Sequence, residues 1–184
     1  DRLGVGVGRN SVDKTIDTYL RYKVLRQSSD ASNMPITVTA FGNAAVRTSP
    51  RKADATFDIT LEDRMSYSGQ LLIARKFSPR LSLQLMPTIV HKNTVDKTIE
   101  NNDLFALGMG GRIKVSRSIA LTSEYYYRFD VGPNNPYYNS LGFGIDIETG
   151  GHVFQLVMTN TRGLTERAFL GETTGQFFEG DIHL

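Results

Sequence analysis

Histidine and cysteine, the side chains that most often bind transition metals, are scarce in this chain, and the histidines are widely spaced. The sequence has three histidines and no cysteine, which excludes thiolate metal sites and disulfides. Zinc requires three or four ligands in an ordered spacing, and His91, His152 and His183 have no further ligand at short range. The motif G-x-S-x-G, which places the nucleophile of many hydrolases, is absent. We therefore expect no catalytic residue, no metal and no cofactor.

The segment GVGVGR, residues 4–9, has the glycine content of a phosphate-binding loop but not its context. Such a loop is followed by a helix whose N-terminus binds the phosphate, and no helical period follows here. Glycines at alternate positions of a strand instead allow close packing inside a barrel. Nucleic acid is not indicated either, because 21 Lys and Arg nearly balance 19 Asp and Glu.

One octamer almost recurs, as NSVDKTID at 10–17 and NTVDKTIE at 93–100. The residues on either side of the two copies differ, so no internal repeat extends beyond them. Neither copy offers the density of oxygen ligands that a calcium loop needs, whereas Asn, Ser, Thr and Asp are common in hairpins. We interpret the copies as two outer hairpins of the same kind.

The elements that position these residues follow from the period of the apolar side chains, which is two along most of the chain. This alternation is typical of strands whose two faces differ. In the first such segment, Ile16 and Leu20 share one face, and Arg21 and Lys23 share the other. With partial strands at both ends we count about ten strands, including 16–25, 35–47, 64–77, 81–92, 105–115, 119–128, 140–148 and 152–160.

The connections between these strands alternate in length. Short turns follow Phe77, Val115 and Glu148, and the link 26–35 falls on the same side. This alternation of short and long links predicts an antiparallel up-and-down meander with short turns at one end and long loops at the other. The long polar links are 48–62, 92–103, 130–138 and 160–180.

Such a meander forms either a soluble barrel with an apolar interior or a transmembrane barrel with its apolar face toward lipid. Strands of about 10 to 13 residues suit a tilted crossing of an apolar band roughly 25 Å tall. Arg75 shares the phase of Leu71 and Ile73, but it lies near a turn, where its side chain can reach head groups. We therefore predict an all-β fold, a transmembrane up-and-down β-barrel, with a soluble barrel as the alternative.

Aromatic residues at the strand ends favour the membrane barrel. A band of Leu and Ile flanked by aromatic residues is what two membrane interfaces select. The predicted aromatic girdle consists of Tyr67, Phe77, Phe105, Tyr125, Tyr127, Tyr137 and Tyr138.

The polar face of the predicted strands has nine basic and four acidic residues. This excess of cations would attract anions into a water-filled lumen, whereas in a narrow barrel the charges would pair and close the lumen. A barrel of intermediate size favours the closed or very narrow lumen. The predicted lumen charge network comprises Arg21, Lys23, Arg64, Arg112, Lys114, Glu124, Arg128, Asp146 and Glu148.

Several long stretches resemble a known family, the Bacteroidota β-barrel proteins of DUF5777. They are NSVDKTIDTYLRYKVLRQ, LLIARKFSPRLSLQLMPTIVHKN, FALGMGGRIKVS and SLGFGIDIETGGHVFQLVMTNTRGLTERAFLGETTG, of which ETGGHVFQL and GETTG are the most specific parts. The resemblance covers essentially the whole chain. It implies an outer-membrane barrel of about twelve strands when whole, with strands before Asp1 and the end of a strand after Leu184 missing here. It implies no settled activity and carries over no catalytic residue.

These patterns together predict one β-barrel domain over 1–184 in the outer membrane, in contact with the lipid bilayer and with no nucleic-acid partner. We expect no enzyme. The expected role is a structural or accessory subunit of an envelope assembly, with other envelope proteins as partners. A narrow porin-like channel for small polar or anionic solutes is the first alternative, and a soluble ligand-binding β-barrel is the second.

Overall fold

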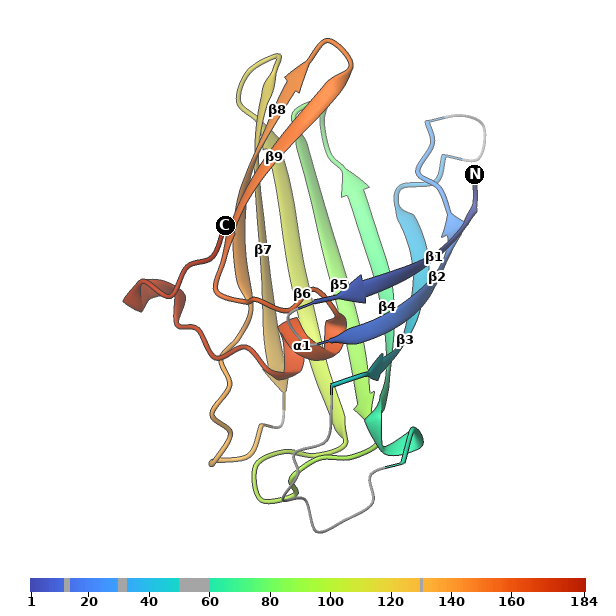
Figure 1. Cartoon of the computed structure of the whole chain (residues 1–184). Helices are drawn as coiled ribbons and strands as arrows, with labels where there is room; N and C mark the ends of the chain where they lie inside the picture. Colours follow the sequence, from blue (N-terminus) through green and yellow to red (C-terminus); the bar gives the residue numbers. More distant parts are fainter. Residues whose placement is uncertain (12–13, 30–32, 50–59, 130) are drawn as a thin grey trace.

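Nine antiparallel strands form one curved sheet in the computed structural model, which describes residues 1–11, 14–29, 33–49, 60–129 and 131–184 (Figure 1). Each strand pairs with the next one along the chain, which confirms the predicted up-and-down meander. β1 and β9 are the two edges of the sheet, which is not closed. The strands are β1 (Leu3–Asn10), β2 (Thr15–Leu25), β3 (Thr37–Arg47), β4 (Met65–Lys76), β5 (Leu81–Lys92), β6 (Asp103–Lys114), β7 (Ile119–Phe129), β8 (Leu141–Thr149) and β9 (His152–Thr159).

The described residues also form three short helical elements: η1 (Glu62–Arg64) before β4, and α1 (Glu166–Gly171) and η2 (Phe177–Glu179) after β9. Beyond η2 the chain returns to the edge of the sheet, where His183 forms an isolated antiparallel bridge with Thr159. Within the described ranges, no helix is long and apolar enough to cross a bilayer.

Serine and glycine form the tight turns at one end of the sheet. In the β4–β5 turn, the Ser78 hydroxyl accepts hydrogen bonds from the backbone N–H groups two and three residues later, at 3.2 and 3.1 Å. Ser116 repeats this arrangement in the β6–β7 turn. Gly150 and Gly151 join β8 to β9 with φ values of +52° and +139°, which favour glycine. These local features fix the register of three hairpins.

The two similar octamers take different structures, although both lie on the long-loop side of the sheet. The first runs from β1 into β2, where Asn10 pairs with Thr15, and residues 12–13 lie outside the described part. The second forms an open loop after β5, in which Asp96 accepts hydrogen bonds from the N–H and hydroxyl of Thr98 at 2.9 and 2.6 Å. The interpretation as hairpins of the same kind is therefore wrong, because the flanking strands, and not the octamer, decide the local structure.

The two faces of the sheet carry different side chains, as the alternation predicts. On β5, Leu85 and Ile89 are exposed on the convex side, whereas Met86 and Val90 are buried on the concave side. An apolar belt so exposed needs a nonpolar environment around the sheet. It also includes Leu20, Leu71, Leu83, Met109, Leu121, Ile145 and Leu156.

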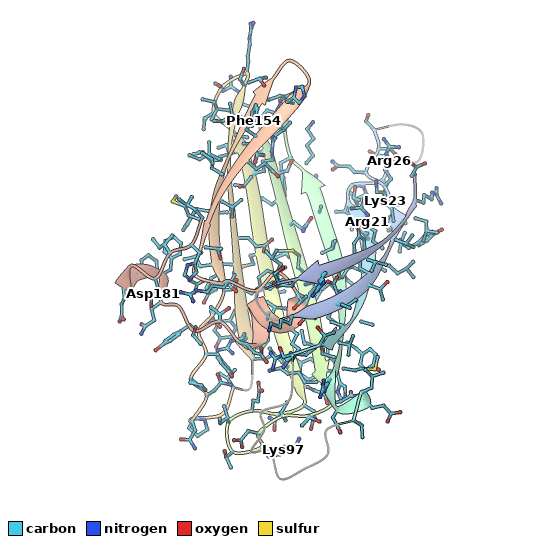
Figure 2. All side chains as sticks on the ribbon, viewed as in Figure 1. Arg21, Lys23, Arg26, Lys97, Phe154 and Asp181 are labelled. Atoms are coloured by element: carbon cyan, nitrogen blue, oxygen red, sulfur yellow. The ribbon has the colours of Figure 1, made fainter. Side chains whose placement is uncertain are left out.

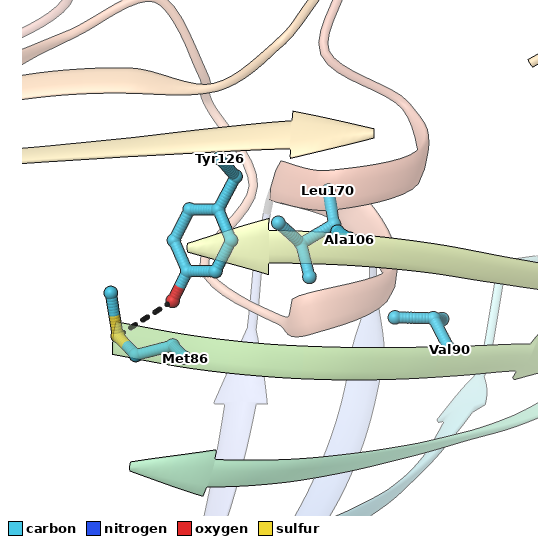
Figure 3. Packing of buried hydrophobic residues seen from close by; sticks show 5 residues of the cluster. All are labelled: Met86, Val90, Ala106, Tyr126 and Leu170. Atoms are coloured by element: carbon cyan, nitrogen blue, oxygen red, sulfur yellow. Dashed lines mark hydrogen bonds between the residues drawn. The ribbon is translucent and has the colours of Figure 1, made fainter. Parts of the chain in front are cut away.

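The concave side is filled toward the long-loop end by residues that follow β9. Helix α1 lies inside the curve of the sheet, next to β4 and β5 (Figure 1). Its Leu170 is fully buried among inward side chains of β5, β6 and β7, namely Met86, Val90, Ala106 and Tyr126 (Figure 3). We call residues 160–175 the interior segment. The prediction of a long outer loop over 160–180 is wrong for this part, because Leu170 finds apolar partners inside the sheet.

Candidate functional site

The interior segment is fixed by hydrogen bonds to the loop between β7 and β8. The side-chain amide of Asn160 donates to the carbonyl oxygen of Asn139 in that loop and, within the segment itself, to that of Gly175, each at 2.9 Å. The N–H of Tyr138 donates to the carbonyl oxygen of Thr173 at 2.7 Å. Asn160 and Thr173 are both buried, so these bonds satisfy polar groups that water does not reach. The segment is therefore an integral part of the barrel interior.

One carboxylate of the interior segment, that of Glu172, binds cations from three elements. Its Oε2 lies 2.8 Å from Arg47 of β3, and its Oε1 lies 2.7 Å from Arg167 of α1 and 3.7 Å from Lys92 of β5. The Lys92 side chain is only 2% exposed and also lies 2.6 Å from Glu100. Charges this buried are tolerated when they are paired. These five residues, the Glu172 cluster, tie the interior segment to the sheet.

Two residues of the predicted sets lie against this cluster. The Tyr137 ring lies 5.9 Å from Lys92 Nζ, a cation–π contact, so Tyr137 faces the interior and does not belong to the outer girdle. Burial, together with the nearby Glu172 carboxylate, raises the pKa of the Tyr137 hydroxyl. Arg128 is buried and donates to the carbonyl oxygen of Tyr137 and to the side chain of Asn139. Its hydrogen-bond partners are therefore uncharged groups.

A second group of ion pairs lies toward the short-turn end, between β6 and β8. Arg112 Nε lies 2.9 Å from a carboxylate oxygen of Asp146, and Lys114 lies 3.3 Å from Glu148. β7 separates these two strands, but its inward residue in the row of Lys114 and Asp146 is the small Ala120. The long basic side chains can therefore reach across β7 to the carboxylates.

Next to the Arg112–Asp146 pair, the concave side holds a cavity of about 580 Å³. Its walls come from β4 to β9, and the interior segment contributes Leu164 and Phe169. The polar residues that line it include Gln84, Arg112, Thr122, Glu124, Gln155 and Thr159. Glu124 of the predicted network thus faces this cavity.

The remaining residues of the predicted charge network lie elsewhere. Arg21 and Lys23 lie on β2, next to the edge of the sheet that is farthest from β9. They lie near Arg26 (Figure 2). A Cβ on Gly4 of β1 would overlap the Arg21 side chain, so the lack of a side chain at Gly4 leaves room for that of Arg21. Arg64 belongs to η1, where its guanidinium lies 3.4 Å from the carbonyl oxygen of residue 49. The structure therefore divides the predicted network into separate groups.

The predicted girdle residues, apart from Tyr137, lie near the ends of the sheet. Tyr125 is half-buried, and its hydroxyl accepts a hydrogen bond from Asn139 at 2.8 Å. At the short-turn end Phe77 is exposed, with the Arg75 guanidinium 5.0 Å from its ring. Four more are exposed near the long-loop end: Tyr67, Phe105, Tyr127 and Tyr138.

Sequence reasoning missed the residues that close the interior. Glu172, Glu100 and Arg167 are in no predicted set, and Arg47 and Lys92 are among the nine basic residues of the predicted polar face, for which no role is predicted. The available signal was the apolar pair Phe169 and Leu170 inside a polar link. Over the ranges that the structure describes, no group of three or more His, Cys, Asp or Glu could hold a metal ion.

Comparison with known proteins identifies a family for this chain. The model of a family described as a membrane bound beta barrel domain, DUF5777, matches residues 1–184. A search of curated proteins finds no match. The family description places the barrel in a membrane, in agreement with the exposed apolar belt, and it disagrees with a soluble ligand-binding barrel.

Proposed function

The chain belongs to the DUF5777 family of membrane-bound β-barrel domains, and on this premise we propose that it is a non-enzymatic barrel of the outer membrane. It serves as a structural or accessory subunit of an envelope assembly, with its short turns toward the periplasm and its long loops outside. The observation that carries the proposal is the interior segment, which occupies the long-loop end of the barrel.

Closure of the interior supports a structural role over transport. A channel needs a continuous water-filled path with groups that bind solutes weakly. Here Leu170 is fully buried against the sheet, and Glu172 is bound to basic residues of β3, β5 and α1. These contacts obstruct the path at the long-loop end. A subunit whose task is to hold partners in place has no need of that path.

The ion pairs of Lys92, Arg112 and Glu172 support the absence of enzymatic activity. A general acid or base must be free to exchange a proton with a substrate. Lys92, Arg112 and Glu172 are each engaged in ion pairs that join elements of the fold. Their arrangement therefore fits a structural task.

Conductance tests the closed barrel directly. Purified full-length protein in a planar lipid bilayer is expected to show no conductance at any voltage. Glu172→Gln, which weakens the contact of the interior segment with Arg47, is expected to give brief openings. Glu148→Gln, at the opposite end of the barrel, is the matched control and should remain silent. Steady conductance of the unaltered protein would refute the closed barrel and support the alternative, a narrow channel for small polar or anionic solutes.

The subunit role needs a separate test. Mild cross-linking of native membranes, followed by isolation of the protein in detergent, is expected to recover one or more envelope proteins in fixed ratio to the barrel. Recovery of folded barrel without any such partner would contradict the role of accessory subunit.

A further inference from the structure

The register of the strands leaves open space on both sides of Glu124. This residue pairs with Gly110 of β6 on one side and with Gly142 of β8 on the other. The next inward side chains in the same row are those of Gln84 and Thr159. Neighbouring strands lie about 4.8 Å apart, so Gln84 and Thr159 are separated by about 19 Å across the sheet. Between them, Glu124 supplies the inward side chain of this row.

The two glycines beside Glu124 differ from others in the sheet. A Cβ on Gly108 would overlap the Tyr126 ring, so that position is filled by its neighbour. A Cβ on Gly110 would come no closer than 3.5 Å to another atom, and one on Gly142 no closer than 3.8 Å. These are ordinary contact distances, so a side chain would fit. Glycine at these positions keeps the space beside Glu124 empty.

The cavity contains one carboxylate that no cation neutralises. Arg112 also lines the cavity, but it is bound to Asp146 at 2.9 Å, and Gln155 occupies the other oxygen of Asp146. Within the described part of the chain, the Glu124 side chain has no hydrogen-bond or ion-pair partner. The Glu124 side chain is exposed to the cavity, and a carboxylate without a partner in such a concave site attracts positive charge.

Part of the lining of the cavity is aromatic and apolar. Phe169 of the interior segment lines it together with Leu164 and Val157. The Phe169 ring packs edge-on against Tyr126, with centroids 5.4 Å apart. Tyr126 lies two residues from Glu124 on the same face of β7, which is about 7 Å along the strand. A carboxylate and an aromatic ring are thus placed to receive one small ligand.

We propose that this cavity, the Glu124 site, binds a small organic cation. The ammonium or quaternary ammonium group pairs with Glu124, and the apolar body of the ligand packs against Phe169. A volume of about 580 Å³ lies within the range of small-molecule sites, roughly 300–1,000 Å³. The site is independent of the subunit role, because a barrel that does not conduct can bind a ligand and a conducting one can lack the site.

Calorimetric titration of the full-length protein in a neutral detergent tests the proposal. The probes are choline, benzyltrimethylammonium and dimethylbutanol, the neutral carbon isostere of choline. Both cations are expected to bind with one site per barrel, and dimethylbutanol about tenfold more weakly or not at all. Glu124→Gln should weaken cation binding about tenfold or more. Glu148→Gln, whose carboxylate pairs with Lys114, should bind as the unaltered protein does.

A second pair of variants tests the empty space. Gly142→Val fills it and should abolish cation binding. Gly42→Val is the matched control, because Gly42 lies on the convex face of β3 and its Cβ would meet nothing closer than 3.9 Å. Thermal unfolding of both variants checks that they fold. Failure of the unaltered protein to bind either cation would overturn the proposal. So would unchanged binding in Glu124→Gln and Gly142→Val, or equal affinity for dimethylbutanol.

Discussion

The ammonium group of Lys92 lies 2.6 Å from a carboxylate oxygen of Glu100 and 3.7 Å from one of Glu172. It thereby joins strand β5 both to the loop that follows it and to the interior segment. Since the Lys92 side chain is almost completely buried, the carboxylates offset the cost of removing its charge from water.

Lys92→Met is expected to lower the free energy of unfolding by about 3 kcal/mol or more, because it leaves two carboxylates without this partner. Urea unfolding in lipid vesicles measures the loss. Lys114→Met is the control: the Lys114–Glu148 pair is about one-third to one-half exposed, and exposed pairs contribute less than about 1 kcal/mol. Equal losses in the two variants would show that burial does not distinguish the pairs.

Leu170→Ala is expected to loosen the interior segment while the sheet remains folded. The loss of a fully buried leucine costs about 2–5 kcal/mol. Trypsin should then cut after Arg167 much faster than in the unaltered protein. Leu164→Ala, in the same segment but 84% exposed, should leave the cleavage rate unchanged. The position of α1 inside the sheet would be refuted by rapid cleavage of the unaltered protein at this site.

Glu166 gives the interior segment a dependence on pH. Burial raises the pKa of its carboxyl, and Asp17 of β2 adds to the increase. An acid with a raised pKa in the folded state destabilises that state when it ionises. The cost is fully present above the raised pKa, and it disappears below the pKa of the unfolded chain, about 4.3. Glu166→Gln should therefore stabilise the protein near pH 7 and have little effect at about pH 3.5.

Denaturant unfolding of the unaltered protein and Glu166→Gln at both pH values measures this difference. Glu179→Gln, an exposed carboxylate on η2, should show no difference at either pH. A stabilisation by Glu166→Gln that is the same at both pH values would contradict the electrostatic explanation.

The orientation of the sheet can be tested with adjacent residues of β5. Leu85 is exposed on the convex side, and its neighbour Gln84 faces the cavity. Leu85→Arg places a charge near the middle of the apolar belt and should cost about 2–4 kcal/mol in lipid vesicles. Gln84→Arg should cost clearly less, since its side chain can reach water in the cavity. The reverse order would mean that the lipid-facing side has been assigned to the wrong face.

The sheet could be predicted from the sequence because each strand carries its own information. Alternation along 81–92 assigns Leu85 outward and Met86 inward without reference to any other strand, and the serines and glycines of the short turns mark the hairpins. Tyr137 was assigned to the wrong side because it lies in a loop, where no alternation applies and its contact with Lys92 decides its position.

The candidate site could be predicted only in part. Glu124 and Arg112 were placed correctly on the inward face by their phase. Their different surroundings depend on which residues stand opposite in neighbouring strands, such as Gly110 and Gly142 beside Glu124. The Glu172 cluster depends on contacts between distant residues, and Arg47 and Glu172 are 125 positions apart. A local pattern contains no information on such a contact.

The position of the interior segment sets an order of assembly. Arg47 and Lys92 reach Glu172 only after β3 and β5 have paired with their neighbours in the sheet. Closing a loop as long as that between Arg47 and Glu172 is entropically unfavourable until the strands between them are in place. We therefore expect that during refolding the sheet forms first, with water still on its concave side, and that residues 160–175 dock last.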